Sequence, residues 1–318
     1  MKRMFLAVAL ISGTSIAIHG QPTPPPWAYT VNPPPTPGAT PAPVDPQPKS
    51  VPGTTVTYTI AQTRDAYNPP DWHPSGHPPM PQAVAHGRPK EMRACGFCHL
   101  VNGQGRPENA SLAGLPAAYI IQQMADFKNG DRKSAEPKMG PPNAMIQDAK
   151  AATAAEIEEA AAYFSSFAYK KWIRVVEVNE VPKTRIAGSM HVPAAEGTEP
   201  LGQRIIEVPE NPARTELRDG ASGFVAYVPV GSIAKGKSLV ETGGKSVACG
   251  TCHGSDLKGL GPMPALAGRS PSYTVRQLFY LQQGVRKGPW APLMKAAVEQ
   301  LTIDDMIAIA AYTSSREP

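Results

Sequence analysis

The stretch Ala94-Cys95-Gly96-Phe97-Cys98-His99-Leu100 reads ACGFCHL, and a close copy, ACGTCHG, runs from Ala248 to Gly254. Each copy places two cysteines three positions apart, with a histidine directly after the second. Together the two stretches contain all four cysteines of the 318-residue chain. The chemistry of this repeated motif therefore decides how the rest of the sequence is interpreted.

Three kinds of chemistry use closely spaced cysteines. A redox pair would need a thioredoxin-like strand–helix context, which the surrounding sequence lacks. A zinc site is poorly supported, because each motif offers three ligands and no other cysteine is left. Cys-x-x-Cys-His is the attachment signature of c-type haem, in which both thiols bind the haem covalently and the histidine ligates the iron. Two occurrences predict two covalently attached c-type haems, at Cys95, Cys98 and His99 and at Cys249, Cys252 and His253.

The N-terminus predicts export. Residues 1–20 have a basic start followed by an apolar run from Met4 to about Ile18, which is short for a membrane span and typical of a signal peptide. We expect cleavage near Gly20 and a periplasmic mature protein. Membrane association would require this segment to stay uncleaved.

The sequence around the motif is also repeated. Leu112-Ala113-Gly114 follows the first histidine at the same distance as Leu266-Ala267-Gly268 follows the second. The matches continue beyond these segments: Tyr119 and Tyr273, Gln123 and Gln277, Arg132 and Arg286, Met145 and Met294, Thr153 and Thr302. The chain therefore contains a duplicated domain.

Both copies have a helical pattern. Apolar residues recur at helical spacing after each Leu-Ala-Gly segment. The final helix of each copy is expected to begin at a capping signal, Thr153-Ala-Ala-Glu156 or Thr302-Ile-Asp-Asp305, with aspartate the weaker partner. A short helix is predicted before each motif, over 82–87 and 232–243, where Gly87 and Gly236 would allow two helices to cross closely.

The regions outside the copies differ in composition. Residues 21–80 form a proline-rich tether that we expect to be extended and solvated, with one short strand over 54–60. Residues 169–230 contain three β-branched or aromatic runs, at 172–178, 204–208 and 223–228, which predict a strand-rich connecting segment. The expected division is a signal peptide (1–20), the tether (21–80), a first haem domain (81–168), the connecting segment (169–230) and a second haem domain (231–318).

Two methionines occupy equivalent positions as candidate sixth ligands. Met145 and Met294 fall in register before the final helices, in proline-containing segments expected to be loops that hold a thioether over the iron. Met139 lies close to Met145 and is an alternative for the first haem. The predicted iron ligands are His99 with Met145 and His253 with Met294.

With these motifs, both copies resemble class I c-type cytochromes, and the tandem is similar to diheme cytochromes of the cytochrome c-four type. The resemblance covers roughly residues 81–167 and 231–315. It implies a mainly α fold, with two class I cytochrome c helical domains in tandem. The proline-rich tether and the strand-rich insert depart from the compact two-domain pattern.

These features predict an electron carrier rather than an enzyme. The expected partners are a periplasmic donor, such as a dehydrogenase or respiratory complex, and an acceptor, such as an oxidase or another cytochrome. The chain has a net charge of +5, the first copy is slightly acidic and the second slightly basic, which does not indicate nucleic-acid binding. Two alternatives stay open: a diheme peroxidase-like enzyme, and a dedicated cytochrome subunit of a periplasmic dehydrogenase.

Overall fold

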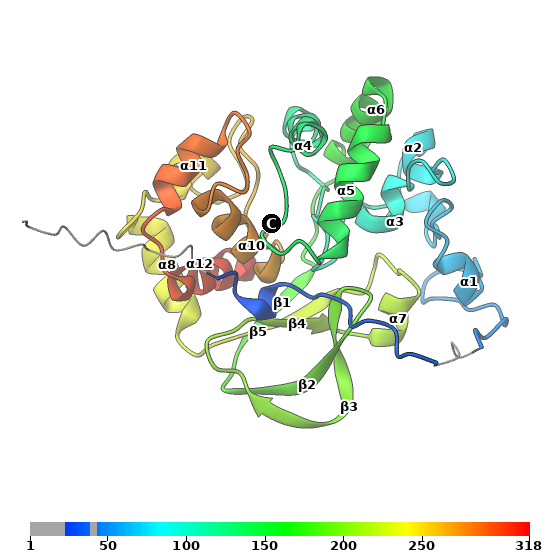
Figure 1. Ribbon diagram of the computed structural model, residues 1–318, viewed down its shortest axis with the longest axis horizontal. Coiled ribbons are helices and arrows are strands. Elements are labelled where there is room, and N and C mark those ends of the chain that lie inside the picture. Colours follow the sequence, from blue (N-terminus) through cyan, green and yellow to red (C-terminus); the bar gives the residue numbers. More distant parts are fainter. Residues whose placement is uncertain (1–22, 39–42) are drawn as a thin grey trace, which may run out of the picture.

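Two groups of helices lie side by side above a small set of strands (Figure 1). This arrangement comes from a computed structural model that describes residues 23–38 and 43–318. The predicted signal peptide lies outside the described residues. One helical group comes from residues 81–168, which we call the first copy, and the other from residues 231–318, the second copy. Residues 169–230, the connecting segment, supply the strands below them.

The helices of the two copies occur in the same order. In the first copy they are α2 (Gln82–Ala85), α3 (Cys95–His99), α4 (Ala117–Asn129), α5 (Gly140–Ala151) and α6 (Ala154–Ser165). In the second copy they are α8 (Ser232–Thr242), α9 (Gly250–His253), α10 (Pro271–Gln282), α11 (Ala291–Val298) and α12 (Ile303–Ser315). Each Cys-x-x-Cys-His motif therefore lies on or beside a short helix that precedes a longer one.

Both final helices begin at the predicted capping residues. Thr153 accepts a hydrogen bond from the Glu156 amide at 3.3 Å, and the Glu156 carboxylate accepts one from the Thr153 amide at 2.8 Å. Thr302 and Asp305 make the same reciprocal pair, with distances of 3.2 and 3.1 Å. The shorter aspartate therefore also closes a capping box, since the helix start brings its carboxylate within reach of the cap amide.

The two glycines expected at helix crossings differ in outcome. A Cβ at Gly236 would lie 1.9 Å from the carbonyl oxygen of Ala308, so only glycine allows α8 to approach α12 this closely. The prediction for Gly87 was wrong. Helix α2 ends at Ala85, and Gly87 instead faces the backbone of Met92, where a Cβ would lie 2.4 Å from the carbonyl oxygen.

The connecting segment forms the three predicted strands and two further ones. The strands are β1 (Ile173–Glu177), β2 (Glu180–Ala187), β3 (Met190–Pro200), β4 (Ile206–Pro209) and β5 (Phe224–Val228), with the short helix α7 (Pro212–Glu216) before β5. One sheet has the order β1-β5-β4, with β1 parallel and β4 antiparallel to β5, while β2 and β3 form an antiparallel hairpin. Sequence analysis missed the hairpin because Pro182, Pro193 and Gly197 interrupt its pattern, which a two-stranded ribbon tolerates.

The N-terminal segment, residues 21–80, is less solvated than its prolines predicted. It contains the 3₁₀ helices η1 (Pro26–Ala28) and η2 (Pro74–Gly76) and the helix α1 (Ile60–Thr63). Tyr29 and Trp72 are buried, and the Trp72 indole donates a hydrogen bond to the Leu217 carbonyl at 2.8 Å. The prediction of a fully solvated tether was therefore wrong, because apolar side chains between the prolines pack on the folded part.

The strand predicted over 54–60 was also wrong. Within it Tyr58 makes only an isolated bridge to Lys49, and Ile60 already begins α1. Thr59 and Gln62 close a capping box at this helix, which ends the extended conformation.

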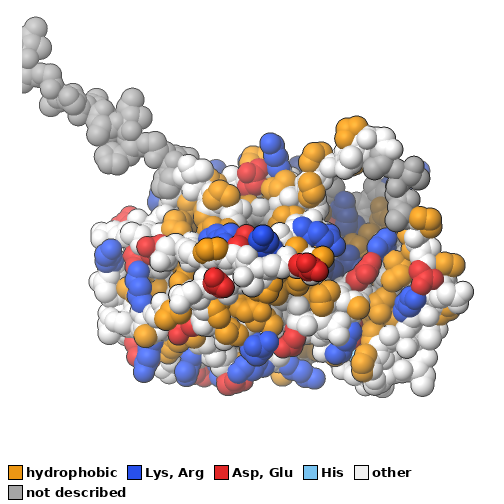
Figure 2. Space-filling model, turned by 90° about the horizontal axis from the view of Figure 1, so that it is seen from below, with side chains coloured by type: hydrophobic (Ala, Val, Ile, Leu, Met, Phe, Trp, Pro, Cys, Tyr) orange, Lys and Arg blue, Asp and Glu red, His pale blue; other side chains and the backbone are white. Residues whose placement is uncertain are grey.

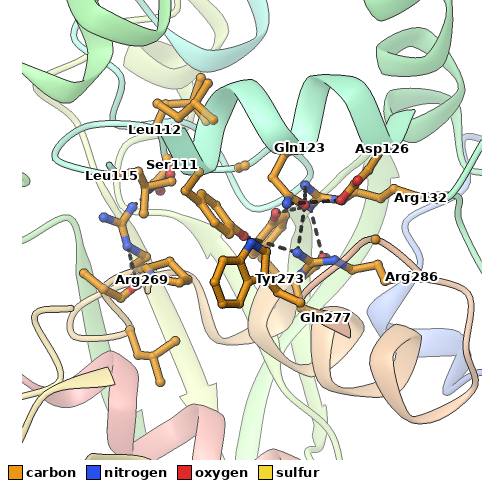
Figure 3. A pocket seen from close by; sticks show the side chains of 18 of the residues that line it. Ser111, Leu112, Leu115, Gln123, Asp126, Arg132, Arg269, Tyr273, Gln277 and Arg286 are labelled. Atoms are coloured by element: carbon orange, nitrogen blue, oxygen red, sulfur yellow. Dashed lines mark hydrogen bonds between the residues drawn. The ribbon is translucent and has the colours of Figure 1, made fainter. Parts of the chain in front are cut away.

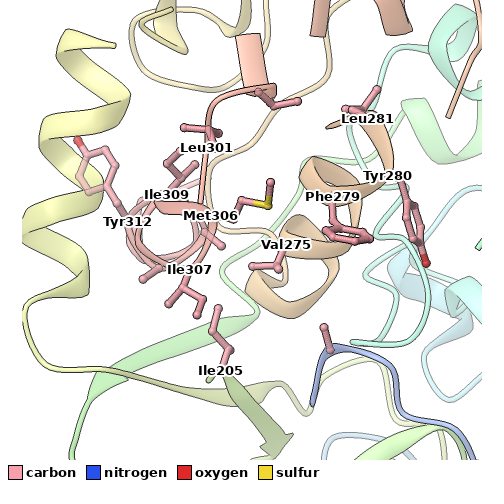
Figure 4. Close-up of a cluster of buried hydrophobic side chains, with 14 of the residues drawn as sticks. Ile205, Val275, Phe279, Tyr280, Leu281, Leu301, Met306, Ile307, Ile309 and Tyr312 are labelled. Atoms are coloured by element: carbon pink, nitrogen blue, oxygen red, sulfur yellow. The ribbon is translucent and has the colours of Figure 1, made fainter. Parts of the chain in front are cut away.

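The largest buried cluster lies in the second copy but includes residues from elsewhere in the chain (Figure 4). Val275, Phe279, Met306 and Ile309 form its centre, between α10 and α12. Its other members include Ala28 and Tyr29 of the N-terminal segment, Met139 of the first copy, and Ile205 and Val228 of the connecting segment. The second copy is thus packed together with all other parts of the described chain.

The face on the strand side carries basic, acidic and apolar side chains interspersed, without a region of one charge sign (Figure 2). Among the described residues, no helix is long and apolar enough to cross a bilayer.

Candidate functional site

A single cavity of about 600 Å³ is lined by both motifs. Most of its lining is apolar, with Leu112 and Phe164 from the first copy and Leu266 and Leu281 from the second. All eight residues predicted to hold haem contribute to its wall: Cys95, Cys98, His99, Met145, Cys249, Cys252, His253 and Met294. The fold therefore gathers around one space residues that are up to two hundred positions apart in sequence.

The two motif histidines are held in the same way. The Nδ1 atom of His99 lies 2.8 Å from the carbonyl oxygen of Ala110, and Nδ1 of His253 lies 2.8 Å from that of Pro264. Because a carbonyl can only accept, Nδ1 carries the proton in both rings and Nε2 keeps its lone pair. Burial also lowers the pKa of both histidines, which keeps the imidazoles neutral. A neutral imidazole with a fixed tautomer is the form that binds a metal.

The four cysteines do not fit thiol redox chemistry. Each is a free thiol in the described part of the chain. Burial raises the pKa of Cys95 to about 12 and that of Cys249 to about 11. Reactive redox cysteines instead have a lowered pKa, which makes the thiolate available.

The methionines lie on helices rather than in the loops that we expected. Met145 belongs to α5 and Met294 to α11, because the prolines before them occupy the first turns of these helices, where proline is well tolerated. Both side chains line the cavity. Met139 is fully buried in the cluster of the second copy and is not among the residues of the cavity wall.

A polar network joins the two copies at the cavity (Figure 3). Arg132 donates to the Gln123 side-chain oxygen at 2.8 Å and to the Tyr273 hydroxyl at 2.7 Å. Arg286, its counterpart in the second copy, donates to the same Gln123 oxygen at 2.8 Å and to Gln277 at 3.3 Å. The two arginines also form an antiparallel bridge through their backbones. The network thus relates the copies by an approximate two-fold symmetry.

This network was not predicted, although the sequence contained a signal for it. Tyr119, Gln123 and Arg132 and their counterparts are polar residues repeated among apolar ones. Burial tends to raise the pKa of Tyr119, but the charges of Arg286 and Arg132 outweigh it and lower the value. Two buried guanidinium groups at the wall therefore place positive charge where the cavity meets the interface.

The second copy surrounds its part of the cavity with exposed apolar side chains. Val247, Leu260, Trp290 and Leu293 line the cavity and are between 49% and 68% exposed. On the first-copy side the wall includes the ion pair between Arg93 and Asp148, whose closest atoms are 3.1 Å apart. The two sides of the cavity therefore present different surfaces to a partner.

The donor set fits covalently attached haem. Two thiols and a neutral imidazole stand together in each copy, beside a thioether and within a mainly apolar cavity. This combination supplies the covalent anchors and axial ligands of a c-type haem.

Comparison with known proteins supports this assignment. A cytochrome c family model matches residues 233–316. The chain is 38% identical over 88 residues to cytochrome c-554(548) of Halomonas halodenitrificans, a match that covers 27% of this chain and 99% of that protein. It is 43% identical over 68 residues to cytochrome c-552 of Acidithiobacillus ferridurans, covering 21% of this chain and only 28% of that protein.

Two longer similarities extend over most of the chain. The thiosulfate dehydrogenase electron acceptor of Thiomonas intermedia is 25% identical over 235 residues, which cover 72% of this chain and 81% of that protein. The solved structure of Acidithiobacillus ferrooxidans cytochrome c4 is 24% identical, with coverage of 70% of this chain and 98% of that one, at a TM-score of 0.45.

The fold and the donor set define a helical haem protein of the c type. The chain belongs to the cytochrome c family. It carries covalently bound haem iron and functions in electron transfer.

Proposed function

We propose that the chain carries two c-type haems, one in each copy, and passes single electrons between periplasmic redox partners. The proposal treats residues 81–168 and 231–318 as two haem domains joined by residues 169–230. The observation that carries it is the cavity wall, in which both complete sets of cysteines, histidine and methionine occur together. Bound haem supplies the one-electron ferrous–ferric couple.

The residues of the chain have separate roles in this proposal. Cys95 and Cys98 in one copy, and Cys249 and Cys252 in the other, anchor the haems. The carbonyls of Ala110 and Pro264 hold the histidines so that Nε2 faces the iron. The apolar wall excludes water, and Arg132 and Arg286 offer positive charge to the haem carboxylates.

The number of haems is tested by a pyridine haemochrome assay combined with protein quantitation. We expect two haems per mature chain. The double variant Cys249→Ala/Cys252→Ala should retain one, and Cys95→Ala/Cys98→Ala should also retain one. A wild-type value of one would contradict the two-haem proposal.

The methionine ligands are tested by the weak far-red band that sulfur-to-iron charge transfer gives in the ferric protein. Met145→Ala and Met294→Ala should each remove about half of it. Met139→Ala is the matched control and should leave the band unchanged, because its side chain packs in the core of the second copy. Loss of half the band in the control would reassign the ligand of the first haem to Met139.

The carrier role predicts that neither iron offers a free position. Reduced protein should bind carbon monoxide slowly and the half-reduced protein should turn over little hydrogen peroxide. Rapid, saturable peroxide reduction would instead favour the diheme peroxidase-like alternative.

We further propose a periplasmic dehydrogenase as the electron donor, and thiosulfate dehydrogenase as the first to test. The similarity to the Thiomonas intermedia electron acceptor supports this, since it extends over 72% of the chain. Thiosulfate together with thiosulfate dehydrogenase should reduce the haems, while thiosulfate alone should not. Failure of this reduction in protein that ascorbate reduces fully would exclude this donor. A complex that persists through gel filtration would favour the dedicated-subunit alternative.

A further inference from the structure

The loop that follows the first motif is covered by the connecting segment, whereas its counterpart is not. Leu100, directly after His99, packs with Trp172 and Phe224 in a separate buried cluster. The Asn102 side chain donates to the Gly220 carbonyl at 2.8 Å. In the second copy the position of Leu100 is taken by Gly254. The connecting segment thus encloses one proximal loop only.

This enclosure buries charges beside the first motif. Arg106 and Glu108 are each 7% exposed, and Arg106 Nε lies 2.9 Å from Glu108 Oε1. In the second copy the equivalent positions are Leu260 and Pro262, which carry no charge. Arg276 is also buried, and its charge is opposed by both Glu108 and Glu207. The first site therefore has a buried group of charges that the second lacks.

Arg218 of the connecting segment adds a positive charge that has no carboxylate of its own. Its guanidinium donates to the carbonyls of Phe97 at 2.8 Å and Thr63 at 3.1 Å, and it lies 3.6 Å from the centre of the Phe97 ring. Phe97 directly precedes the haem-anchoring Cys98. Burial raises the pKa of the Cys98 thiol to about 11, and the charge of Arg218 opposes this increase. The field of Arg218 therefore reaches the sulfur that joins the haem.

A buried positive charge next to a haem favours the form with one more electron, and screening by solvent is weak there. We propose that Arg218 is a positioning residue of the electron-transfer reaction that raises the reduction potential of the first haem site above that of the second. This inference rests on the two-haem proposal. It makes the connecting segment a device that directs where a single electron resides.

The test is a spectroelectrochemical titration of the full chain with both midpoint potentials resolved. Arg218→Gln should lower one midpoint and leave the other unchanged, with a change on the order of tenfold in the electron distribution, equivalent to about 59 mV for one electron. Arg218→Lys should keep the wild-type value, because the charge remains. Arg174→Gln is the matched control, since Arg174 belongs to the same segment but is exposed and pairs with Glu210. It should change neither midpoint.

A second variant separates charge from general damage to the fold. Glu108→Gln removes the negative charge from the same group and should raise the midpoint that Arg218→Gln lowers, whereas structural loosening would move both in one direction. Repeating the titration with Met294→His, which lowers the second site, identifies the affected haem. Two haems per chain with unchanged midpoints in Arg218→Gln, or equal shifts at both sites, would overturn the inference. A haem count of one would instead overturn the two-haem proposal.

Discussion

The loops after the two haem motifs have the same backbone and different surroundings. The Gly105 amide donates to the His99 carbonyl at 2.9 Å, and the Gly259 amide donates to the His253 carbonyl at the same distance. The first loop is nevertheless buried beneath the connecting segment, whereas Leu260 of the second is 59% exposed. A duplicated sequence can thus keep the geometry that holds the cofactor while each copy acquires its own environment. Four variants sharpen or break this comparison, in order of decreasing expected effect on stability.

The largest effect should come from Leu100→Ala. Leu100 is 3% exposed and anchors the first loop in the cluster of the connecting segment, so its truncation should cost about 2–4 kcal/mol of unfolding free energy. Leu260→Ala in the exposed loop is the control and should cost less than about 0.5 kcal/mol. Denaturant unfolding followed by circular dichroism measures both. Equal losses would mean that the two loops are not enclosed differently.

The helix crossing of the second copy should be the next most sensitive point. Gly236→Ala places a methyl group against the Ala308 carbonyl and should destabilise the protein by about 1–3 kcal/mol. Gly140→Ala, at the start of α5, meets no atom within 4 Å and should be neutral within about 0.5 kcal/mol. Thermal unfolding of the two variants compares them. A neutral Gly236→Ala would contradict the close approach of α8 and α12.

The capping box of the second copy should give a smaller, pH-dependent effect. Burial alone would raise the pKa of Asp305, but hydrogen bonds from Lys235 and Thr302 outweigh it and hold the pKa at about 2. Because the folded-state pKa lies below the ordinary value of 3.8, this stabilisation is present above pH 4 and is lost as the pH falls towards 2. Asp305→Asn should remove about 1–2 kcal/mol at pH 7 and almost nothing at pH 2.

Unfolding of this variant measured between pH 7 and 2 checks the prediction, and Asp304→Asn, at an exposed neighbour, is the control. A difference between Asp305→Asn and wild type that does not shrink with acid would show that Asp305 stabilises the helix without its charge.

The smallest effect on stability should come from the exposed apolar side chains at the cavity. Leu293 is 68% exposed, so Leu293→Glu should change the unfolding free energy by less than about 0.5 kcal/mol. It should nevertheless slow electron exchange with a protein partner several-fold, which stopped-flow absorbance measures. Ile121→Glu makes the same change on an exposed residue of the first copy. Equal slowing by both variants would mean that the partner does not prefer the second copy.

Much of the fold followed from local sequence signals. The capping threonines, the glycine at the α8–α12 crossing and three strands of the connecting segment were predicted, since each depends on neighbouring residues or on a steric need that only glycine meets. The hairpin of β2 and β3 was missed because its prolines and glycine are tolerated only at an unpaired edge. Burial of Trp72 was missed because its partner, Leu217, lies far away in sequence.

The candidate site divides in the same way. The sequence by itself determined the haem-anchoring cysteines, the histidines and the repeated methionines as candidates, because covalent attachment and axial ligation require particular residue types at short spacing. Only the tertiary structure decided that Met145 rather than Met139 lines the cavity, that Arg132 and Arg286 meet across the two copies, and that Arg218 lies against the first motif. These contacts join residues distant in sequence, and no local pattern encodes which distant segments pack together.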